Sequence, residues 1–245
     1  MKEKETTPPG LLPVHIQSQP DDTTCGPTCL DAVYRYFGDE IELDQVIRET
    51  GKLEQGGTLA VFLACHALRR GYRATIYTYN LNMFDPSWFA SPEIQLSERL
   101  ARQTEHKRSR KLRVATDAYL ELLRLGGRIR FRELTPSLIR GHMKRSVPML
   151  TGLSATYLYR TSREDPMTND YDDIRGEPTG HFVLICGYDK ETRRVGVADP
   201  LLPNPMSEEQ YYFVDMYRLL GAIHLGVLTY DANILVVEPP RRRKA

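Results

Sequence analysis

Apolar residues recur at helical spacing in the first third of the chain. From Cys25 to Phe37 an apolar side chain returns every three or four residues, and Gly38 follows as a C-cap signal. A second, shorter helix is expected at 43–50, and a third from an N-cap at Thr58 through Arg70. The pattern therefore predicts a helical N-terminal part, with a cysteine at or near the start of its first helix.

Beyond Arg70 the pattern changes. Alternation rich in Tyr, Thr and Ile predicts a strand at 72–79. We then expect, in chain order, a packed loop at 80–90, a charged helical stretch at 93–126 and a short strand or connector at 129–131. A helix at 135–144 and an apolar strand at 147–153 follow. Thr135 and Pro136 are suited to the N-cap and first position of the helix at 135–144.

The last third is predicted to be rich in strands. Residues 154–179 form a long, polar, non-periodic segment directly before His181, and we expect it to form a lid or wall facing a substrate. After it we expect two strands at 181–188 and 194–198, a helix at 208–220, and a final strand pair at 223–230 and 234–237. Helices followed by an antiparallel sheet predict an α+β fold.

The length and composition indicate one domain. The chain has 245 residues, 41% of them hydrophobic, which is enough for a sizeable core. Prolines near the N-terminus predict a flexible arm at 1–13, and the basic end predicts a disordered tail at 239–245. Residues 14–238 are expected to form a single domain with a helical insertion at about 85–144.

Charge gives little indication of a macromolecular partner. The net charge of +1 provides no general attraction to nucleic acid or anionic lipid, and no stretch has the apolar length of a membrane span. The segment 102–113 is strongly basic. A solvated helix face or a turn between two helices is the simpler interpretation, and a docking surface for an acidic partner is the alternative. Without interleaved aromatic residues, nucleic-acid binding is not expected.

The cysteines favour a reducing compartment. The chain has four scattered cysteines (Cys25, Cys29, Cys65, Cys186). Cys25 and Cys29 lack the spacing of a pair of zinc ligands. The N-terminus has no apolar segment of a signal peptide. We therefore expect a cytoplasmic protein with no metal, no cofactor and no disulfide scaffold, and the sequence gives no indication of its oligomeric state.

Four polar residues supply the parts of a cysteine-nucleophile site. A helix N-terminus favours the thiolate over the thiol, which would make Cys25 reactive. Gln19 stands six residues before it, His181 begins one predicted strand, and Asp199 ends the next. Because antiparallel pairing brings those strand ends together, we expect the imidazole and the carboxylate to meet. A thiol, an imidazole with an orienting carboxylate, and an amide for an oxyanion together favour acyl chemistry.

Simpler interpretations exist for several of these residues. A lone cysteine that opens a helix is most often a small buried hydrophobe, as we expect for Cys29. Asp189 is a rival to Asp199 as the orienting carboxylate, but it belongs to the turn at the far end of the hairpin. Asp21 and Asp22 are expected to shape the turn before the thiol, since a carboxylate beside it would oppose its ionisation.

These motifs resemble the papain-like cysteine peptidases of family 39, the double-glycine leader peptidases attached to bacteriocin exporters, and their stand-alone relatives. The resemblance is carried by Gln19, Cys25-Gly26, His181-Phe182-Val183-Leu184 and Asp199-Pro200. It implies a papain-like fold in which an N-terminal helical part, with the nucleophile on its helix, packs on a C-terminal antiparallel sheet.

The resemblance also implies roles for the four residues. Cys25 would be the nucleophile, His181 the general base and then acid, Asp199 the group that orients His181, and Gln19 part of the oxyanion hole. The implied activity is hydrolysis of a peptide or other amide through a thioester, by a stand-alone member of the family. Two alternatives remain: an acyltransferase or peptide ligase on the same fold, and a catalytically inactive papain-like binding module.

Overall fold

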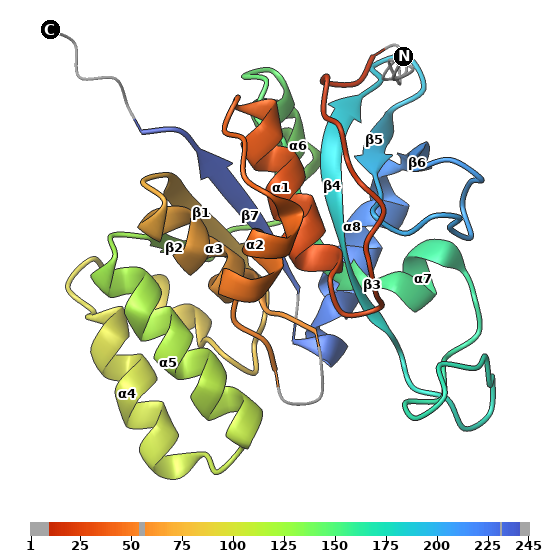
Figure 1. Cartoon of the computed structure of the whole chain (residues 1–245). Coiled ribbons are helices and arrows are strands. Elements are labelled where there is room, and N and C mark those ends of the chain that lie inside the picture. The colour runs from red at the N-terminus through yellow and green to blue at the C-terminus, as the bar shows by residue number, and fades with distance from the viewer. Residues whose placement is uncertain (1–9, 54–56, 231, 241–245) are drawn as a thin grey trace, which may run out of the picture.

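A seven-stranded sheet forms the centre of the molecule (Figure 1). The structure is a computed structural model that describes residues 10–53, 57–230 and 232–240. The strand order is β2-β1-β7-β3-β4-β5-β6, and every neighbouring pair is antiparallel except β1 and β2, which run parallel. The strands are β1 (Arg73–Thr78), β2 (Arg128–Arg130), β3 (Met149–Ser154), β4 (Gly180–Tyr188), β5 (Arg194–Ala198), β6 (Tyr211–Asp215) and β7 (Asn233–Glu238).

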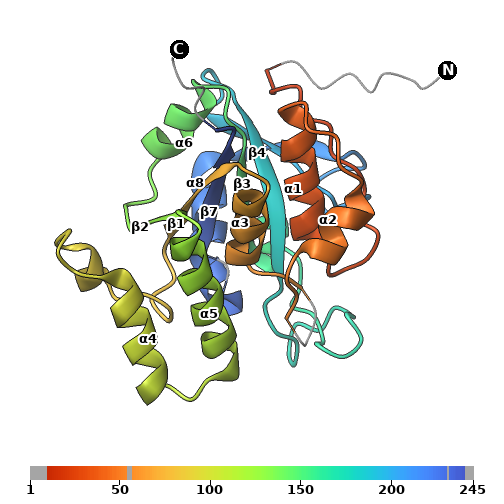
Figure 2. The same cartoon turned by 60° about the vertical axis from the view of Figure 1, so that its left-hand side comes forward.

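Helices cover both faces of the sheet, so apolar side chains on its two sides form two cores. The α1 and α3 helices lie on one face with α5 outside them, and α6 and α8 lie on the other (Figure 2). In the described part of the chain the helices are α1 (Cys25–Tyr36), α2 (Leu43–Glu49), α3 (Ala60–Arg69), η1 (Pro86–Phe89), α4 (Leu96–His106), α5 (Arg110–Arg124), α6 (Pro136–Met143), α7 (Ala155–Tyr159), α8 (Met216–Leu225) and η2 (Gly226–Thr229).

The α1 helix packs directly on β4, and the first turn of α1 is held tightly. A Cβ atom at Gly26 would lie 2.4 Å from the Thr58 methyl group and 3.4 Å from the Phe182 ring. One turn later, the Cys29 Sγ lies 3.4 Å from the Phe182 carbonyl oxygen. The glycine after Cys25 therefore lets the helix start approach the segment before α3 closely.

The α+β fold predicted from the pattern is confirmed, with the cysteine-bearing helix packed on a mostly antiparallel sheet. The three N-terminal helices lie where they were predicted. The basic segment 102–113 spans the end of α4, a turn and the start of α5, as the simpler interpretation of its charge expects, and a docking role for it stays a prediction. Thr135 caps α6 by accepting a hydrogen bond from the Leu138 amide at 3.3 Å.

Two predictions for the last third were wrong. Residues 208–220 do not form one helix, because 211–215 alternate in burial as strand β6 and the helix starts only at Met216. Asp215 marks the change, since its carboxylate accepts hydrogen bonds from the Tyr217 and Arg218 amides as an N-cap. Residues 223–230 are not a strand either: they complete α8 and form η2, so β7 pairs instead with β1 and β3.

Three smaller predictions also differ from the structure. The sheet is not confined to the C-terminal part, because β1 and β2 extend it. Residues 154–179 are not entirely irregular, because they begin with the short helix α7. Thr58 is not the N-cap of α3, whose cap is Leu59; the Thr58 hydroxyl donates to the Gly51 carbonyl at 2.8 Å.

The chain ends were predicted to be loose. From Leu11 the N-terminal segment lies against β4, where the Leu12 amide donates to the Cys186 carbonyl at 2.7 Å. The rest of the predicted arm (1–9) and the tail from Arg241 lie outside the described residues. The η1, α4 and α5 helices fall between β1 and β2, and their origin as an insertion stays a prediction. None of the described helices is long and apolar enough to cross a membrane.

Candidate active site

Cys25 is the first residue of α1, and a compact turn leads into it. The Asp21 carboxylate accepts hydrogen bonds from the Thr23 amide and hydroxyl at 2.8 and 2.7 Å, and these bonds lower its pKa. The Thr24 hydroxyl donates to the Asp21 carbonyl at 2.9 Å. Asp21 therefore shapes the turn, as expected, and the cysteine retains 8% of its surface for contact from outside.

His181 and Asp199 are brought together by the sheet. His181 is the second residue of β4, and Asp199 follows the last residue of β5, its antiparallel neighbour. The Nε2 of His181 lies 2.8 Å from Oδ1 of Asp199, and both side chains are buried. Because Asp199 engages Nε2, the ring nitrogen left for Cys25 is Nδ1. Asp189 lies at the other end of this hairpin, where its carboxylate accepts from Glu191 and Thr192.

The Asp199 carboxylate accepts three further hydrogen bonds. The hydroxyl groups of Tyr159 and Tyr212 each donate to Oδ2 at 2.7 Å, and the Leu201 amide donates to Oδ1 at 3.0 Å. Tyr159 is the last residue of α7, and its ring also lies 6.0 Å from the His181 ring, measured between centroids. A buried carboxylate with every oxygen engaged stays ionised and keeps one orientation.

The pKa values of this cluster shift in the directions that an ion pair requires. Burial by itself would lower the pKa of His181. The charge and hydrogen bond of Asp199, together with a hydrogen bond and charge from Cys25, outweigh burial and raise the pKa of His181 to about 10. Burial by itself would raise the pKa of Asp199, but His181 and the two tyrosine hydroxyls outweigh it and lower that pKa. The imidazolium and the carboxylate therefore stabilise each other's charge.

Gln19 lies beside the same cluster. Its backbone amide donates to the Pro200 carbonyl at 2.9 Å, which ties the loop before Cys25 to the loop after Asp199. Its side-chain Nε2 donates to the Asp21 carbonyl at 3.0 Å, and Oε1 is buried with no hydrogen-bond partner among the described residues. One hydrogen of Nε2 remains for a further acceptor, because an amide nitrogen carries two.

The other cysteines are buried and lack such partners. Burial raises the pKa of the Cys29 thiol well above its ordinary value, and it raises the pKa values of Cys65 and Cys186 to about 12. All four thiols are free of disulfides. Among the described residues, no group of three or more His, Cys, Asp or Glu side chains is arranged to hold a metal ion.

Sequence reasoning missed Tyr159 and Tyr212. Tyr212 lies in a segment that was predicted to be helical (208–220), and Tyr159 lies in a segment where no helix was predicted. The segment after Tyr159 contacts the turn before Cys25, because the Asn169 side chain donates to Asp22 at 3.3 Å. Within this segment, isolated antiparallel β-bridges join Glu164 to Tyr171 and to Glu177.

No protein-family model matches the sequence, and no curated protein matches it either. Solved structures are similar in fold. A putative C39-like peptidase from Bacillus anthracis aligns with a TM-score of 0.51 and 14% identity, covering 95% of this chain and 98% of that one.

Two further solved structures align with lower TM-scores. A double-glycine-motif protease from an AMS/PCAT transporter, in complex with the leader peptide, has a TM-score of 0.46 and 13% identity over 96% of this chain and 97% of that one. Xylellain, a cysteine protease from Xylella fastidiosa, has a TM-score of 0.42 and 14% identity over 96% and 85%. The Bacillus anthracis likeness shows that the chain shares the fold of that C39-like peptidase.

Proposed function

We propose that the protein is a cysteine peptidase or amide hydrolase that acts on a peptide through a thioester intermediate. The observation that carries the proposal is the pairing of His181 with a fully engaged Asp199 carboxylate, together with the effect of Cys25 that helps to raise the pKa of His181. A structural cysteine at a helix start needs no buried imidazole, and a buried imidazole needs no carboxylate held by two tyrosines. Together they are the groups that generate and use a thiolate nucleophile.

The chemistry follows from these groups. His181 holds the proton of Cys25, and the thiolate attacks the carbonyl carbon of the substrate. The resulting oxyanion is stabilised by the Cys25 backbone N–H at the start of α1 and by the free hydrogen of the Gln19 amide. His181 then donates its proton to the leaving amine, the C–N bond breaks, and the acyl group remains on sulfur as a thioester.

Water completes the cycle. His181, now neutral, removes a proton from a water molecule, and the hydroxide attacks the thioester carbonyl. The C–S bond breaks, the carboxylic acid leaves, and the thiolate and imidazolium are regenerated. Asp199 keeps the same orientation of the ring in both halves and does not itself exchange a proton.

Alkylation and turnover of active-site variants test the proposal. Iodoacetamide should modify Cys25 in the native protein while the three buried thiols are protected, and the modified protein should lose amide hydrolysis. Cys25→Ala and His181→Ala should each abolish turnover while the far-UV circular dichroism stays native. Cys186→Ala is the matched control, since it removes a buried thiol that bonds only the Gly196 carbonyl. Labelling of Cys29 or Cys65 in preference to Cys25 would count against the proposal.

A single-turnover experiment identifies the acceptor. The acylated enzyme is mixed with water alone and with an added amine, and the products are separated by mass spectrometry. Hydrolysis that is unaffected by the amine is the expected result. A new amide product would instead indicate acyl transfer on the same site.

A further inference from the structure

One face of the sheet at β2 and β1 is lined by arginine side chains. The register pairs Thr75 with Arg128 and Tyr77 with Arg130, while Arg73 stands opposite Glu238 on β7. Since side chains at alternate positions share a face and neighbouring strands lie about 4.8 Å apart, these residues form one surface. The side chains of Arg128 and Arg130 are exposed on it. Ala74 and Ile76 point the other way, into the core under α3.

This surface is concave. A cavity of about 670 Å³ lies over it, bounded by the strands and by the C-terminal end of α6. Five arginines and a histidine line the cavity (Arg73, Arg128, Arg130, Arg132, Arg145, His142). A volume of this size lies within the range of small-ligand sites. We call this set of residues the arginine cavity.

The described residues compensate the charge of the arginine cavity only in part. Among the described residues that line it, Glu238 is the one carboxylate, and it pairs with Arg73 at 3.5 Å. Arg128, Arg130 and Arg132 have no ion-pair partner within the described residues. Arg145 donates to Nδ1 of His142 at 2.7 Å, so even this arginine meets a neutral acceptor. Burial and the Arg145 charge lower the pKa of His142, as expected where the potential is positive.

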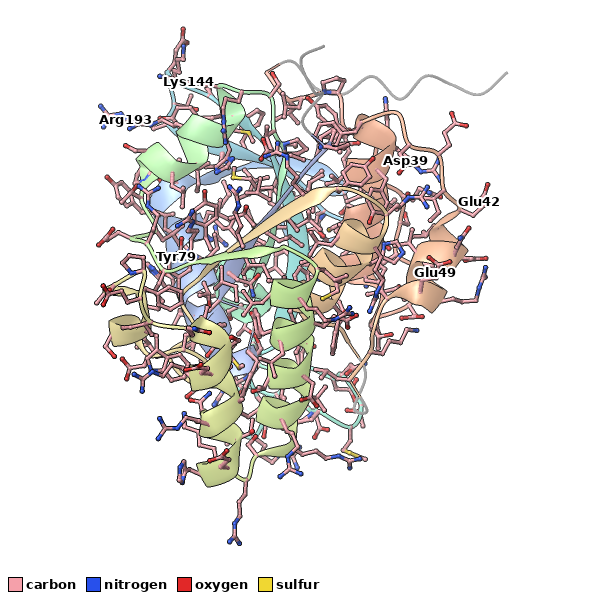
Figure 3. All side chains as sticks on the ribbon, turned by 90° about the vertical axis from the view of Figure 1, so that its left-hand side faces the viewer. Asp39, Glu42, Glu49, Tyr79, Lys144 and Arg193 are labelled. Atoms are coloured by element: carbon pink, nitrogen blue, oxygen red, sulfur yellow. The ribbon has the colours of Figure 1, made fainter. Side chains whose placement is uncertain are left out.

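This accumulation is local. The whole chain carries a net charge of only +1, so the five arginines of the cavity form a local excess of positive charge. Figure 3 shows Lys144, the neighbour of Arg145, on one flank of the molecule and Asp39, Glu42 and Glu49 on the other. The surface is also separate from the candidate active site, because β7 and β3 stand between β1 and β4 in the sheet.

We propose that the arginine cavity binds a compact anion that carries several phosphate groups, such as a nucleoside triphosphate. Each guanidinium presents a planar fork of donors that matches the oxygens of a phosphate group, and several phosphates in a row can meet several forks at once. An acidic peptide fits less well. It would spread its charges along an extended backbone and needs apolar anchors, whereas the cavity has only Val236 and Tyr77 to offer them.

A simpler explanation of the two arginines on β2 is protection of a sheet edge. β2 lies at one edge of the sheet, and charged side chains on an edge strand oppose aggregation. That explanation covers Arg128 and Arg130 but not Arg132 and Arg145, which lie beyond the strand and line the same cavity. It predicts that losing the arginines causes aggregation without any loss of ligand binding.

Titration calorimetry of the full chain at low salt tests the proposal, with tripolyphosphate, ATP and adenosine as probes. ATP and tripolyphosphate should bind and adenosine should not. Tighter binding of ATP than of tripolyphosphate would identify a nucleotide, and equal binding would identify the phosphate chain alone as the ligand. The variant R128Q/R130Q should bind at least about tenfold more weakly, because two charge-assisted sets of hydrogen bonds are removed.

The matched control is R102Q/R113Q, which removes the same charge from the exposed basic segment at α4 and α5. It should bind the probes as the parent chain does. The proposal is overturned if neither phosphate probe binds at millimolar concentration, if both double variants weaken binding equally, or if a deca-glutamate peptide or a single-stranded oligonucleotide binds more tightly than ATP.

Discussion

At the scale of single residues, Asp199 determines how firmly the candidate site is held. The carboxylate accepts four hydrogen bonds, and only one of them comes from the His181 ring. Two of these come from tyrosine hydroxyls, which can be removed without changing the packed ring. Tyr159 and Tyr212 are positioning residues in this arrangement, because they act on His181 only through Asp199.

Removing either hydroxyl should therefore weaken catalysis without unfolding the protein. Tyr212→Phe is expected to lower kcat/KM about tenfold, the value of one hydrogen bond to a charged group. Without this hydroxyl the carboxylate is held less firmly in the orientation that pairs with the ring, so the ion pair weakens and the alkaline limb of the pH profile should move to lower pH. Tyr36→Phe is the control, since its hydroxyl bonds only the distant Ser146 carbonyl. An unchanged pH profile in Tyr212→Phe would contradict the positioning role.

The same ion pair predicts a pH dependence of stability. The pKa of His181 in the folded protein, about 10, lies above its ordinary value of 6.5. Folding therefore favours the protonated ring, and this contribution is fully present below about pH 6.5 and is lost as the pH rises toward 10. In Asp199→Asn the charge that raises the pKa is absent. The Tm difference between the parent and Asp199→Asn should thus become smaller from pH 6 to 10; a constant difference would contradict the ion pair.

Sequence could suggest Cys25, His181 and Asp199 because each has a local signal: a helix start, a strand start and a strand end. The two tyrosines have no such signal. Tyr159 lies 40 residues from Asp199 in sequence and Tyr212 lies 13 away, and their contact exists only after α7 and β6 have packed around the carboxylate. A single sequence cannot distinguish such a tyrosine from one that only fills the core.

At the scale of elements, prediction succeeded where one pattern dominated and failed where two overlapped. Helix α1 has a clear apolar period and a glycine stop. Around Asp215 the signals conflict, because a strand of alternating burial runs directly into a helix, so 208–220 resembles a single apolar-periodic segment. The end of α8 and η2 together contain several aliphatic residues, which favoured a strand, yet both elements are helical and pack on β3.

The start of α1 depends on one close contact between elements, and this can be tested. Gly26→Ala would place a Cβ 2.4 Å from the Thr58 Cγ2, where no real methyl group fits. We expect a loss of about 1–3 kcal/mol in unfolding free energy, measured by urea denaturation, together with slower alkylation of Cys25 as the helix start moves.

The double variant Gly26→Ala, Thr58→Ser shows whether this contact is the cause. Serine keeps the hydroxyl that bonds the Gly51 carbonyl but lacks the methyl group. The double variant should recover most of the lost stability, and Thr58→Ser alone is the reference. If the double variant is as unstable as Gly26→Ala, the cost arises elsewhere, for instance in the backbone of the first turn.

At the scale of the whole molecule, the helices between β1 and β2 are not an appendage. Residues of α5 are buried in the same core as α1 and α3, among them Leu112, Tyr119 and Leu122. Tyr119 packs on Phe84 with the ring centroids 4.8 Å apart, and the Cys65 Sγ on α3 lies 3.5 Å from the Ala118 carbonyl oxygen. The core that positions the Cys25 helix therefore extends through α3 to α5.

If these helices share one core, damage to α5 should be felt at the candidate active site. Leu122→Ala is expected to cost about 2–5 kcal/mol, because the side chain is fully buried and leaves a cavity. Thermal unfolding followed by circular dichroism and by the accessibility of Cys25 to iodoacetamide should shift to a lower temperature together. Leu81→Ala, which removes the same atoms from a side chain that is 63% exposed, should shift neither. Separate transitions for the two probes in Leu122→Ala would show that α5 unfolds on its own, and that the cysteine helix is supported by the sheet without it.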